Sequence, residues 1–156
     1  MKVLAIDPGT WDSGYVVWDG VKLWDRGKVK NELLLQMVMV PVFKDTETLV
    51  IEQIKSYGNA MGQSTIDTVF WCGRFAQAFR GKVHLLPRVE VKKHVCHTGA
   101  AKDTNIKQAL VDRFAYGVRN HGKGTKAEKG FFYGFVGDTF AAMGVAVTFF
   151  DRNMSN

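Results

Sequence analysis

Acidic side chains at the ends of apolar segments are the residues of this sequence best suited to chemistry. Asp7 directly follows the apolar run of residues 3–6, and Pro8 and Gly9 then break the strand that this run predicts. A carboxylate at the end of a buried strand is costly to desolvate unless an opposite charge meets it. Hard divalent cations such as Mg²⁺ take oxygen ligands, so Asp7 is a candidate metal ligand. The alternative is a carboxylate that caps the Pro-Gly turn and has no chemical role.

Glu52 and Asp138 occupy comparable positions. Glu52 follows the buried-strand pattern of residues 49–51, and Asp138 opens the apolar segment that predicts the last helix. If the strands that carry Asp7 and Glu52 are neighbours, the two carboxylates converge and repel each other unless a cation lies between them. A pair of Mg²⁺ ions about 4 Å apart, which clamps the attacking water and the leaving oxygen of a phosphodiester, would resolve this repulsion. The alternatives are a helix N-cap for Asp138 and one half of a salt bridge for Glu52.

Basic residues are concentrated in one part of the chain. The formal net charge is +6 and the pI is near 9.4. Residues 80–129 hold twelve Lys or Arg against four Asp or Glu, whereas residues 1–79 hold eight basic against nine acidic residues. A basic half beside a half that contains acidic candidates indicates a polyanion-binding surface next to a metal site. The alternative is a solvated basic face that only keeps the protein soluble.

The pattern of apolar residues predicts an α/β fold with a mixed sheet, in one domain over residues 1–156. Three antiparallel strands come first, followed by parallel strands with helices on the faces of the sheet. The predicted strands cover residues 3–6, 13–18, 21–29, 48–54 and 83–86. The predicted helices cover residues 32–40, 64–80, 89–96, 103–114 and 138–149.

Three local features are predicted as well. The helix over residues 64–80 is expected to be amphipathic, with an apolar stripe that consists of Ile66, Val69, Phe70, Gly73, Ala76 (or Phe75) and Phe79. Asp103 or Thr104 is expected to cap the helix that ends at residue 114. The Gly- and Lys-rich residues 117–137 are expected to form a mobile loop.

The sequence also favours a cytoplasmic protein. No apolar run approaches the roughly 20 residues of a membrane span, and Asp7 interrupts the first segment before the apolar core of a signal peptide could form. Two cysteines, Cys72 and Cys96, do not make a disulfide framework in a chain of this size. We therefore expect the reducing cytoplasm as its location.

Four short motifs, spread over most of the chain, are similar to those of a known family. They are IDPGT at residues 6–10, IEQ at 51–53, VKKHVCHTGAAKDTNIKQAL at 91–110 and DTFAAMGVAVT at 138–148. Together they resemble RuvC-type Holliday-junction resolvases, in the short and divergent form found among bacteriophages. The resemblance implies an RNase H-like fold and a homodimer with one active site for each of two opposed DNA strands. It also implies Mg²⁺- or Mn²⁺-dependent hydrolysis of phosphodiesters in branched DNA, the activity of a crossover junction endodeoxyribonuclease.

Asp7, Glu52 and Asp138 match the metal-binding acids of this family, so the resemblance implies two metal ions at a site made of these residues. The family usually has two acidic or His residues on the last helix, three positions apart and so on one face. Here the residue three positions after Asp138 is Ala141 and the residue three positions before it is Phe135. One ligand is therefore missing whether Asp138 matches the first or the second of the two positions. The expected consequence is a weakly held second ion, or a substitute ligand such as Asp103.

Six further residues are candidate DNA contacts, and they are Lys55, Tyr57, Asn59, Lys92, Lys93 and Lys102. Lys92, Lys93 and Lys102 match the family's lysines near the scissile phosphate, where a positive charge stabilises developing negative charge. Lys102 is therefore also a catalytic candidate. Lys55 stands where the family often has a Phe that stacks on bases. The ring of Tyr57, two residues further on, could stack on an unpaired base or pack on its own loop.

Structure-selective cleavage of branched DNA, with four-way junctions as substrate, is the function we expect. A branched-DNA-binding protein with weak or no cleavage is the first alternative, because of Ala141. A small-molecule phosphotransferase of the actin-like ATPase and sugar-kinase class is the second, because its first strand also ends in an Asp and a Gly-rich turn. Such enzymes need two similar lobes and a second phosphate loop, which a single domain of this length lacks.

Overall fold

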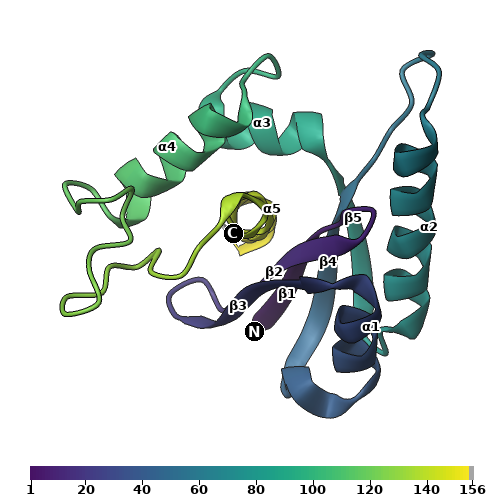
Figure 1. Ribbon diagram of the computed structural model, residues 1–156, viewed down its shortest axis with the longest axis horizontal. Helices are drawn as coiled ribbons and strands as arrows, with labels where there is room; N and C mark the ends of the chain where they lie inside the picture. Colours follow the sequence, from purple (N-terminus) through teal and green to yellow (C-terminus); the bar gives the residue numbers. More distant parts are fainter. Residues whose placement is uncertain (155–156) are drawn as a thin grey trace.

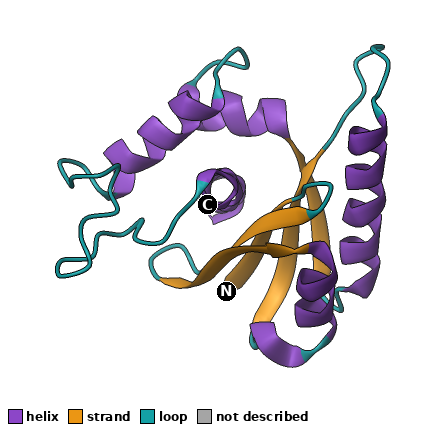
Figure 2. Cartoon of the chain, in the orientation of Figure 1, coloured by secondary structure: helices purple, strands orange, loops and turns teal. Residues whose placement is uncertain are grey.

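A five-stranded mixed sheet forms the centre of the computed structural model, which describes residues 1–154 (Figures 1 and 2). Its strands are β1 (Lys2–Asp7), β2 (Asp12–Trp18), β3 (Leu23–Lys30), β4 (Thr46–Gln53) and β5 (Lys82–Pro87). Their order across the sheet is β3-β2-β1-β4-β5. The first three strands pair antiparallel, whereas β1 with β4 and β4 with β5 pair parallel. The predicted mixed sheet is confirmed, and β1 and β4 are neighbours.

Helices cover both faces of this sheet. They are α1 (Asn31–Met39), the short 3₁₀ helix η1 (Pro41–Phe43), α2 (Gln63–Ala78), α3 (Arg88–Cys96), α4 (Asp103–Phe114) and α5 (Gly137–Met154). Figure 1 shows α1 and α2 on one face and α5 on the other, with α3 and α4 packed around α5. Within residues 1–154, none of the helices has the length and apolar character that a membrane span needs.

β1 is held in place because its side chains alternate between two hydrophobic clusters. Val3 and Ala5 belong to the cluster that includes α5, whereas Leu4 and Ile6 belong to the cluster that includes α1 and α2. All four side chains are fully buried. Burial of one Val, Leu or Ile side chain contributes about 1.5–3 kcal/mol to stability. Packing on both faces therefore fixes the position of Asp7, the last residue of the strand.

α5 is the central helix of the second layer, and most of its residues are buried. A helix that is apolar all round suits a position between a sheet and other helices (Figure 2). Gly144 permits close packing, because a Cβ there would lie 3.2 Å from a methyl carbon of Val91 and 3.3 Å from one of Ile106. The tight contacts with α3 and α4 explain why the helix continues beyond residue 149, where the prediction ended it.

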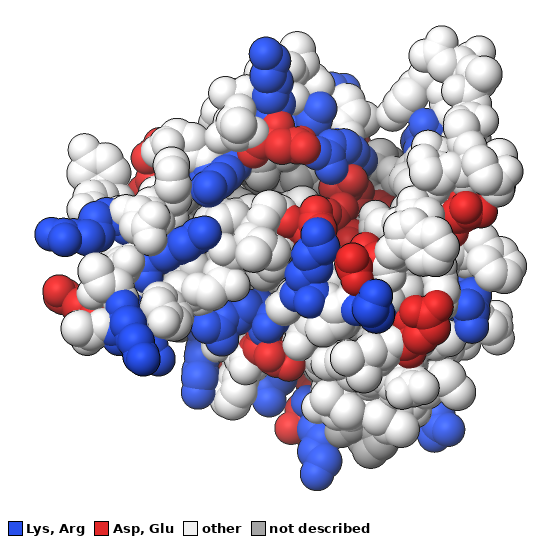
Figure 3. All heavy atoms as spheres, in the orientation of Figure 1, with Lys and Arg blue, Asp and Glu red and all other residues white. Residues whose placement is uncertain are grey.

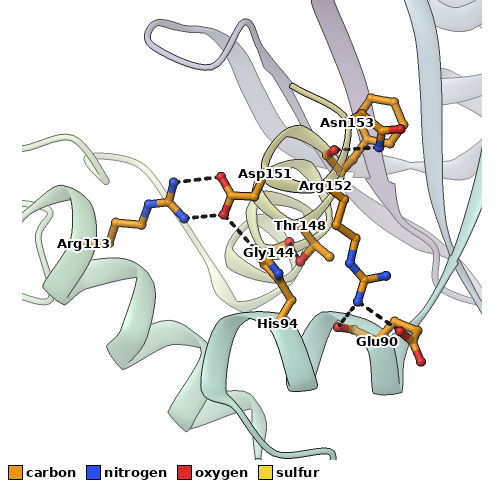
Figure 4. A network of polar contacts seen from close by, with 9 residues as sticks. Glu90, His94, Arg113, Gly144, Thr148, Asp151, Arg152 and Asn153 are labelled. Carbon is orange, nitrogen blue, oxygen red and sulfur yellow. Dashed lines mark hydrogen bonds and ion pairs between the residues drawn. The ribbon is translucent and has the colours of Figure 1, made fainter. Parts of the chain in front are cut away.

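Polar contacts fix the C-terminal end of α5 to α3 and α4 (Figure 4). Arg113 of α4 donates two hydrogen bonds to the carboxylate of Asp151, at 2.6 and 2.9 Å, and His94 Nε2 of α3 lies 2.7 Å from the same carboxylate. Arg152 donates to Glu90 Oε2 of α3 at 3.0 Å. The hydrogen bonds from Arg113 are the main cause of a lowered pKa at Asp151. This network sets the direction of a helix whose opposite end reaches the candidate site.

The buried stripe of α2 differs from the predicted one. Its buried residues are Thr68, Trp71 and Phe75. Several residues of the predicted stripe are exposed instead, namely Ile66, Val69, Phe70 and Gly73. α2 carries two apolar stripes, and the sheet packs against the one with the larger rings, those of Trp71 and Phe75, whose centroids lie 5.7 Å apart. The second stripe remains on the surface.

The N-terminus of α4 is also capped differently from the prediction. The N-cap residue is Lys102, and its backbone N–H donates to Asn105 Oδ1 at 2.8 Å. Asp103 and Thr104 lie inside the first turn. The carboxylate of Asp103 therefore points toward other partners, which are described below.

Of the residues predicted as a mobile loop, 117–136 lack helices and strands apart from an isolated bridge between Gly124 and Lys129, and Gly137 begins α5. The prediction of a mobile loop is wrong for the second half of this stretch, because Phe132 and Phe135 are buried in the core with exposures of 0% and 1%. The two rings contact each other at a centroid distance of 4.9 Å. Aromatic packing anchors this segment, which its Gly and Lys content does not reveal.

Candidate metal and DNA site

The three predicted metal ligands meet at one edge of the sheet. Asp7 is the last residue of β1, and Glu52 lies next to the end of β4. Because Ile6 pairs with Ile51 in the parallel ladder, Asp7 and Glu52 come side by side where both strands end. Asp138 reaches the same place from the first turn of α5. Glu52 and Asp138 are both close enough to Asp7 to raise its pKa.

Gly14 of β2 lets α5 approach Asp7 closely. A Cβ at Gly14 would lie 2.3 Å from the backbone oxygen of Asp138, so a larger residue there would displace the start of α5. Gly14 pairs with Asp7 on one side and with Lys28 of β3 on the other. Asp7, Gly14 and Lys28 are therefore neighbours across three adjacent strands, and Asp138 lies against Gly14, the middle residue.

Two basic side chains pair with these acids, and neither was predicted from the sequence. Lys28 Nζ lies 2.8 Å from Asp138 Oδ2, and Arg88 Nη1 donates to Glu52 Oε1 at 2.9 Å. The second amino group of Arg88 donates to the carboxylate of Asp103. Lys28 reaches the site through the register between β2 and β3, and Arg88 through the start of α3 directly after β5. Neither contact has a local signal in the sequence.

Burial and mutual repulsion shift the pKa values of these groups. Burial, and then the nearby carboxylates of Glu52 and Asp138, raise the pKa of Asp7 to about 8. Burial also raises the pKa of Glu52, although Arg88 opposes this shift. The hydrogen bond to Asp138 raises the pKa of Lys28. The site thus holds more negative charge than its basic residues offset, and an added cation would favour the ionised form of Asp7.

A cavity of about 320 Å³ opens beside these residues. Its lining residues are Asp7, Arg88, Asp103, Thr104, Ile106, Lys107, Gly137, Asp138, Phe140 and Ala141. Carboxylate oxygens suit a hard divalent cation such as Mg²⁺, so the chemistry of the site fits the predicted metal. In the arrangement described for residues 1–154, no three or more His, Cys, Asp or Glu side chains form a group that could hold a metal ion. Metal binding would therefore require Glu52 or Asp138 to turn from its basic partner toward Asp7.

The predicted DNA-binding lysines lie at different distances from the acids. Lys92 of α3 is close enough to Glu52 to oppose the rise in its pKa. Lys93 of α3 and Lys102 at the start of α4 are exposed, and the cavity lining does not include them. Lys107 of α4, which was not among the predicted contacts, does line the cavity. Of the predicted lysines, only Lys92 is thus shown to act on one of the acids.

The loop between β4 and α2, residues 54–62, projects from the end of β4 that carries Glu52 (Figure 1). Lys55, Tyr57 and Asn59 all lie in this loop and are exposed, and Tyr57 is 70% exposed. The exposure of its ring disfavours the alternative in which Tyr57 packs on its own loop. The loop lies beside the site, but these three side chains are not part of the cavity lining.

Surface charge follows the same arrangement. Figure 3 shows acidic side chains gathered near the middle of one face, with Lys and Arg side chains around them. The basic residues are denser on the side of α4 and the segment that follows it. Basic surface around a small acidic centre is an arrangement that attracts phosphates and still leaves oxygen ligands for a cation.

Two of the solved structures that resemble this chain are of RuvC from Thermus thermophilus. The first is 18% identical, covers 99% of this chain and 97% of that chain, and has a TM-score of 0.66. The second, T. thermophilus RuvC in complex with a Holliday junction substrate, is 17% identical, covers 97% of this chain and 95% of that chain, and has a TM-score of 0.61. No protein-family model and no curated protein matches the chain. The chain therefore has a RuvC-like, RNase H-like fold, as predicted.

Replacing Asp7 with Asn should stabilise the protein when no divalent cation is present. The pKa of Asp7 is about 8 in the folded chain, whereas an Asp in an unfolded chain has a pKa of about 4. Between these pH values only the folded state keeps the proton, so the folded state loses stability as the pH rises from 4 to 8. We expect Asp7→Asn to gain on the order of a few kcal/mol at pH 8 and progressively less toward pH 4.

Thermal unfolding in EDTA, followed by circular dichroism across this pH range, measures the effect. Asp112→Asn is the matched control, because Asp112 is an exposed acid on α4 whose only described side-chain bond is to Gln108. An Asp7→Asn protein that unfolds at or below the wild-type temperature at pH 8 would contradict the electrostatic description of the site.

Proposed function

We propose that this protein is a metal-dependent endonuclease that resolves branched DNA by hydrolysing one phosphodiester in each of two opposed strands. The observation that carries the proposal is the meeting of Asp7, Glu52 and Asp138 at one sheet edge, in a RuvC-like fold that spans nearly the whole chain. The T. thermophilus RuvC was solved with a Holliday junction substrate, and we extend that substrate class to this chain. Junction shape would dominate selection, because phosphate contacts carry no direct sequence information. The cytoplasm is the location we propose.

The three carboxylates would hold Mg²⁺, with Mn²⁺ as a substitute. When bound, such an ion supplies an activated water and offsets the charge that develops on the phosphate. Asp7 and Glu52 hold their oxygens at a fixed edge, because β1 and β4 are buried on both faces. Arg88 orients Glu52 through its hydrogen bond. The backbone positions of the acids are thereby fixed before DNA arrives, and only side-chain rotation would be needed to complete the metal site.

Residues around the cavity would hold the DNA. Lys92 acts on Glu52 and Lys107 lines the cavity, and we assign both to phosphate oxygens of the cleaved strand. Lys93 and Lys102 extend this basic surface, and Lys102 would stabilise the charge that develops on the phosphate. Tyr57 would stack on an unpaired base at the branch point, an interaction worth about 1–3 kcal/mol. Its loop neighbours Lys55 and Asn59 would contact the backbone beside it.

A homodimer would place two such sites on opposed strands. An apolar groove of about 470 Å³ lies between α1 and α2, and it is lined by Leu35, Met39, Val69, Phe70, Gly73, Arg74, Gln77 and Ala78. Phe70 at its centre is 66% exposed. An exposed patch of large apolar side chains is typical of an interface. We propose that this groove contacts the same groove of a second copy.

A binding protein with weak or no cleavage is the second candidate. The specific observation in its favour is that Ala141 lines the cavity where a fourth acid is expected. Such a protein would bind junctions through the same basic surface and leave their strands intact.

Cleavage of a labelled four-way junction tests the proposal against a linear duplex of the same sequence. In Mg²⁺ or Mn²⁺ we expect paired nicks in the junction, no product in EDTA and little product from the duplex. Asp7→Asn and Glu52→Gln should each lower the cleavage rate at least about 100-fold, because each removes a metal ligand. Asp112→Asn should cut at the wild-type rate.

Tight junction binding without nicks in either metal would favour the binding protein. Equal cutting of junction and duplex would contradict the proposed substrate. Unchanged cleavage by Asp7→Asn would contradict the site itself.

Phe70→Asp should separate the proposed dimer into monomers, because a charge would be buried at the centre of the interface. Light scattering coupled to size-exclusion chromatography measures the mass. The monomer should nick single strands without pairing the cuts. Val21→Asp is the control, since Val21 is 86% exposed in the turn between β2 and β3. A wild-type monomer, or a Phe70→Asp protein that remains dimeric, would contradict this assignment.

A further inference from the structure

The candidate site contains fixed positive charges as well as acids. Lys28 contacts Asp138 at 2.8 Å, and Arg88 contacts both Glu52 and Asp103. These contacts link β3 with α5, and β4 with the first turns of α3 and α4. The role of these ion pairs depends on how many divalent cations the site binds. Cation binding itself rests on the proposed function.

The position of Lys28 is set by the backbone. Lys28 pairs with Gly14 in the β2–β3 ladder, and the backbone of Asp138 packs directly against Gly14. The backbones of both ion-pair residues therefore lie next to Gly14. Both side chains remain partly exposed, at 45% for Lys28 and 41% for Asp138, so the pair adds little to folding stability. Its exposure instead leaves the ammonium group accessible to a phosphate that approaches Asp138.

The lysine that lines the cavity, Lys107, is directed differently from Lys28. Lys107 Nζ lies 5.1 Å from the ring centroid of Phe140, and no ion pair of Lys107 with an acid is found among the described residues. Arg88 is shared between two carboxylates, so it acts as a positioning residue for Glu52. Asp103, the suggested substitute ligand, is held by this same guanidinium group. Lys28 is therefore the basic group beside Asp138.

The acids and their partners limit the charge that the site can accept. Lys28 is paired with Asp138, and Arg88 with Glu52 and Asp103, while all three of these carboxylates act on Asp7. With the four acids ionised, the two ion-paired basic groups leave two negative charges, which one divalent cation balances. Lys92 adds further positive charge near Glu52. A second divalent cation would leave net positive charge in a partly buried site, which is unfavourable without a further ligand.

Ala141 removes that further ligand. It lies three residues after Asp138, so it occupies the same face of α5, and it lines the same cavity. A carboxylate at this position would face the cavity beside Asp138. Its methyl group offers no oxygen to a second ion.

We infer that each site binds a single divalent cation, and that the Lys28 ammonium group supplies the positive charge that a second ion supplies in two-metal nucleases. Lys28 neutralises one oxygen of Asp138 and faces the phosphate with its remaining N–H donors. The family resemblance implied two metal ions in each site. In this inference, one divalent cation and the Lys28 ammonium group take the place of those two ions.

Counting bound Mn²⁺ by electron paramagnetic resonance tests this inference without measuring cleavage. The wild-type chain should bind one Mn²⁺, and Asp7→Asn should weaken that binding at least about tenfold. The double variant Lys28→Met with Ala141→Asp should bind two, with the spectral broadening of two neighbouring Mn²⁺ ions. Lys28→Arg keeps the charge and should bind one. Lys30→Met, a charge removed from the same strand face, should also bind one.

The outcomes separate this inference from the proposed function. Two Mn²⁺ bound by the wild-type chain in an Asp7-dependent way would overturn the inference and leave the nuclease proposal intact. A folded double variant that still binds one would overturn the roles of Lys28 and Ala141. Absence of any Mn²⁺ binding that Asp7→Asn weakens would contradict the metal site of the proposed function itself.

Discussion

The carboxylate of Asp7 ends a strand that is buried on both faces, and the site depends on this placement. Burial, together with the nearby Glu52 and Asp138, raises the pKa of Asp7 to about 8. Ionising Asp7 therefore needs positive charge nearby. Lys28 and Arg88 provide part of it, but each is paired with a different acid. The proposed divalent cation would supply the positive charge that is still lacking, and the basic surface around the site suits the proposed polyanionic substrate.

The rest of the fold holds the carboxylates at this edge despite their repulsion. Parallel pairing of β1 with β4 fixes Asp7 beside Glu52. At the other end of the second layer, Arg113 and its neighbours tie α5 to α3 and α4 (Figure 4). Gly14 then allows the start of α5 to rest on the sheet. Packing energy distributed over the core offsets the electrostatic cost concentrated at the site.

The sequence contained enough information for the sheet and its acids. A four-residue apolar run followed by an Asp predicts the end of a buried strand, and the same pattern recurs before Glu52. Ala141 was visible as a departure from the family pattern. Lys28 and Arg88 were not predictable, because cross-strand register and the start of α3 place them. The face of α2 was also undetermined, since two apolar stripes compete for the sheet and tertiary packing decides between them.

Anomalous diffraction from crystals grown with Mn²⁺ tests the central claim most directly. The account predicts one anomalous peak per chain, coordinated by Asp7 and at least one of Glu52 and Asp138, with Lys28 Nζ near the position of the absent second ion. A peak elsewhere, or no peak at Mn²⁺ concentrations that support cleavage, would contradict the assignment of these carboxylates as metal ligands. Two peaks beside Asp7 would contradict the role given to Lys28.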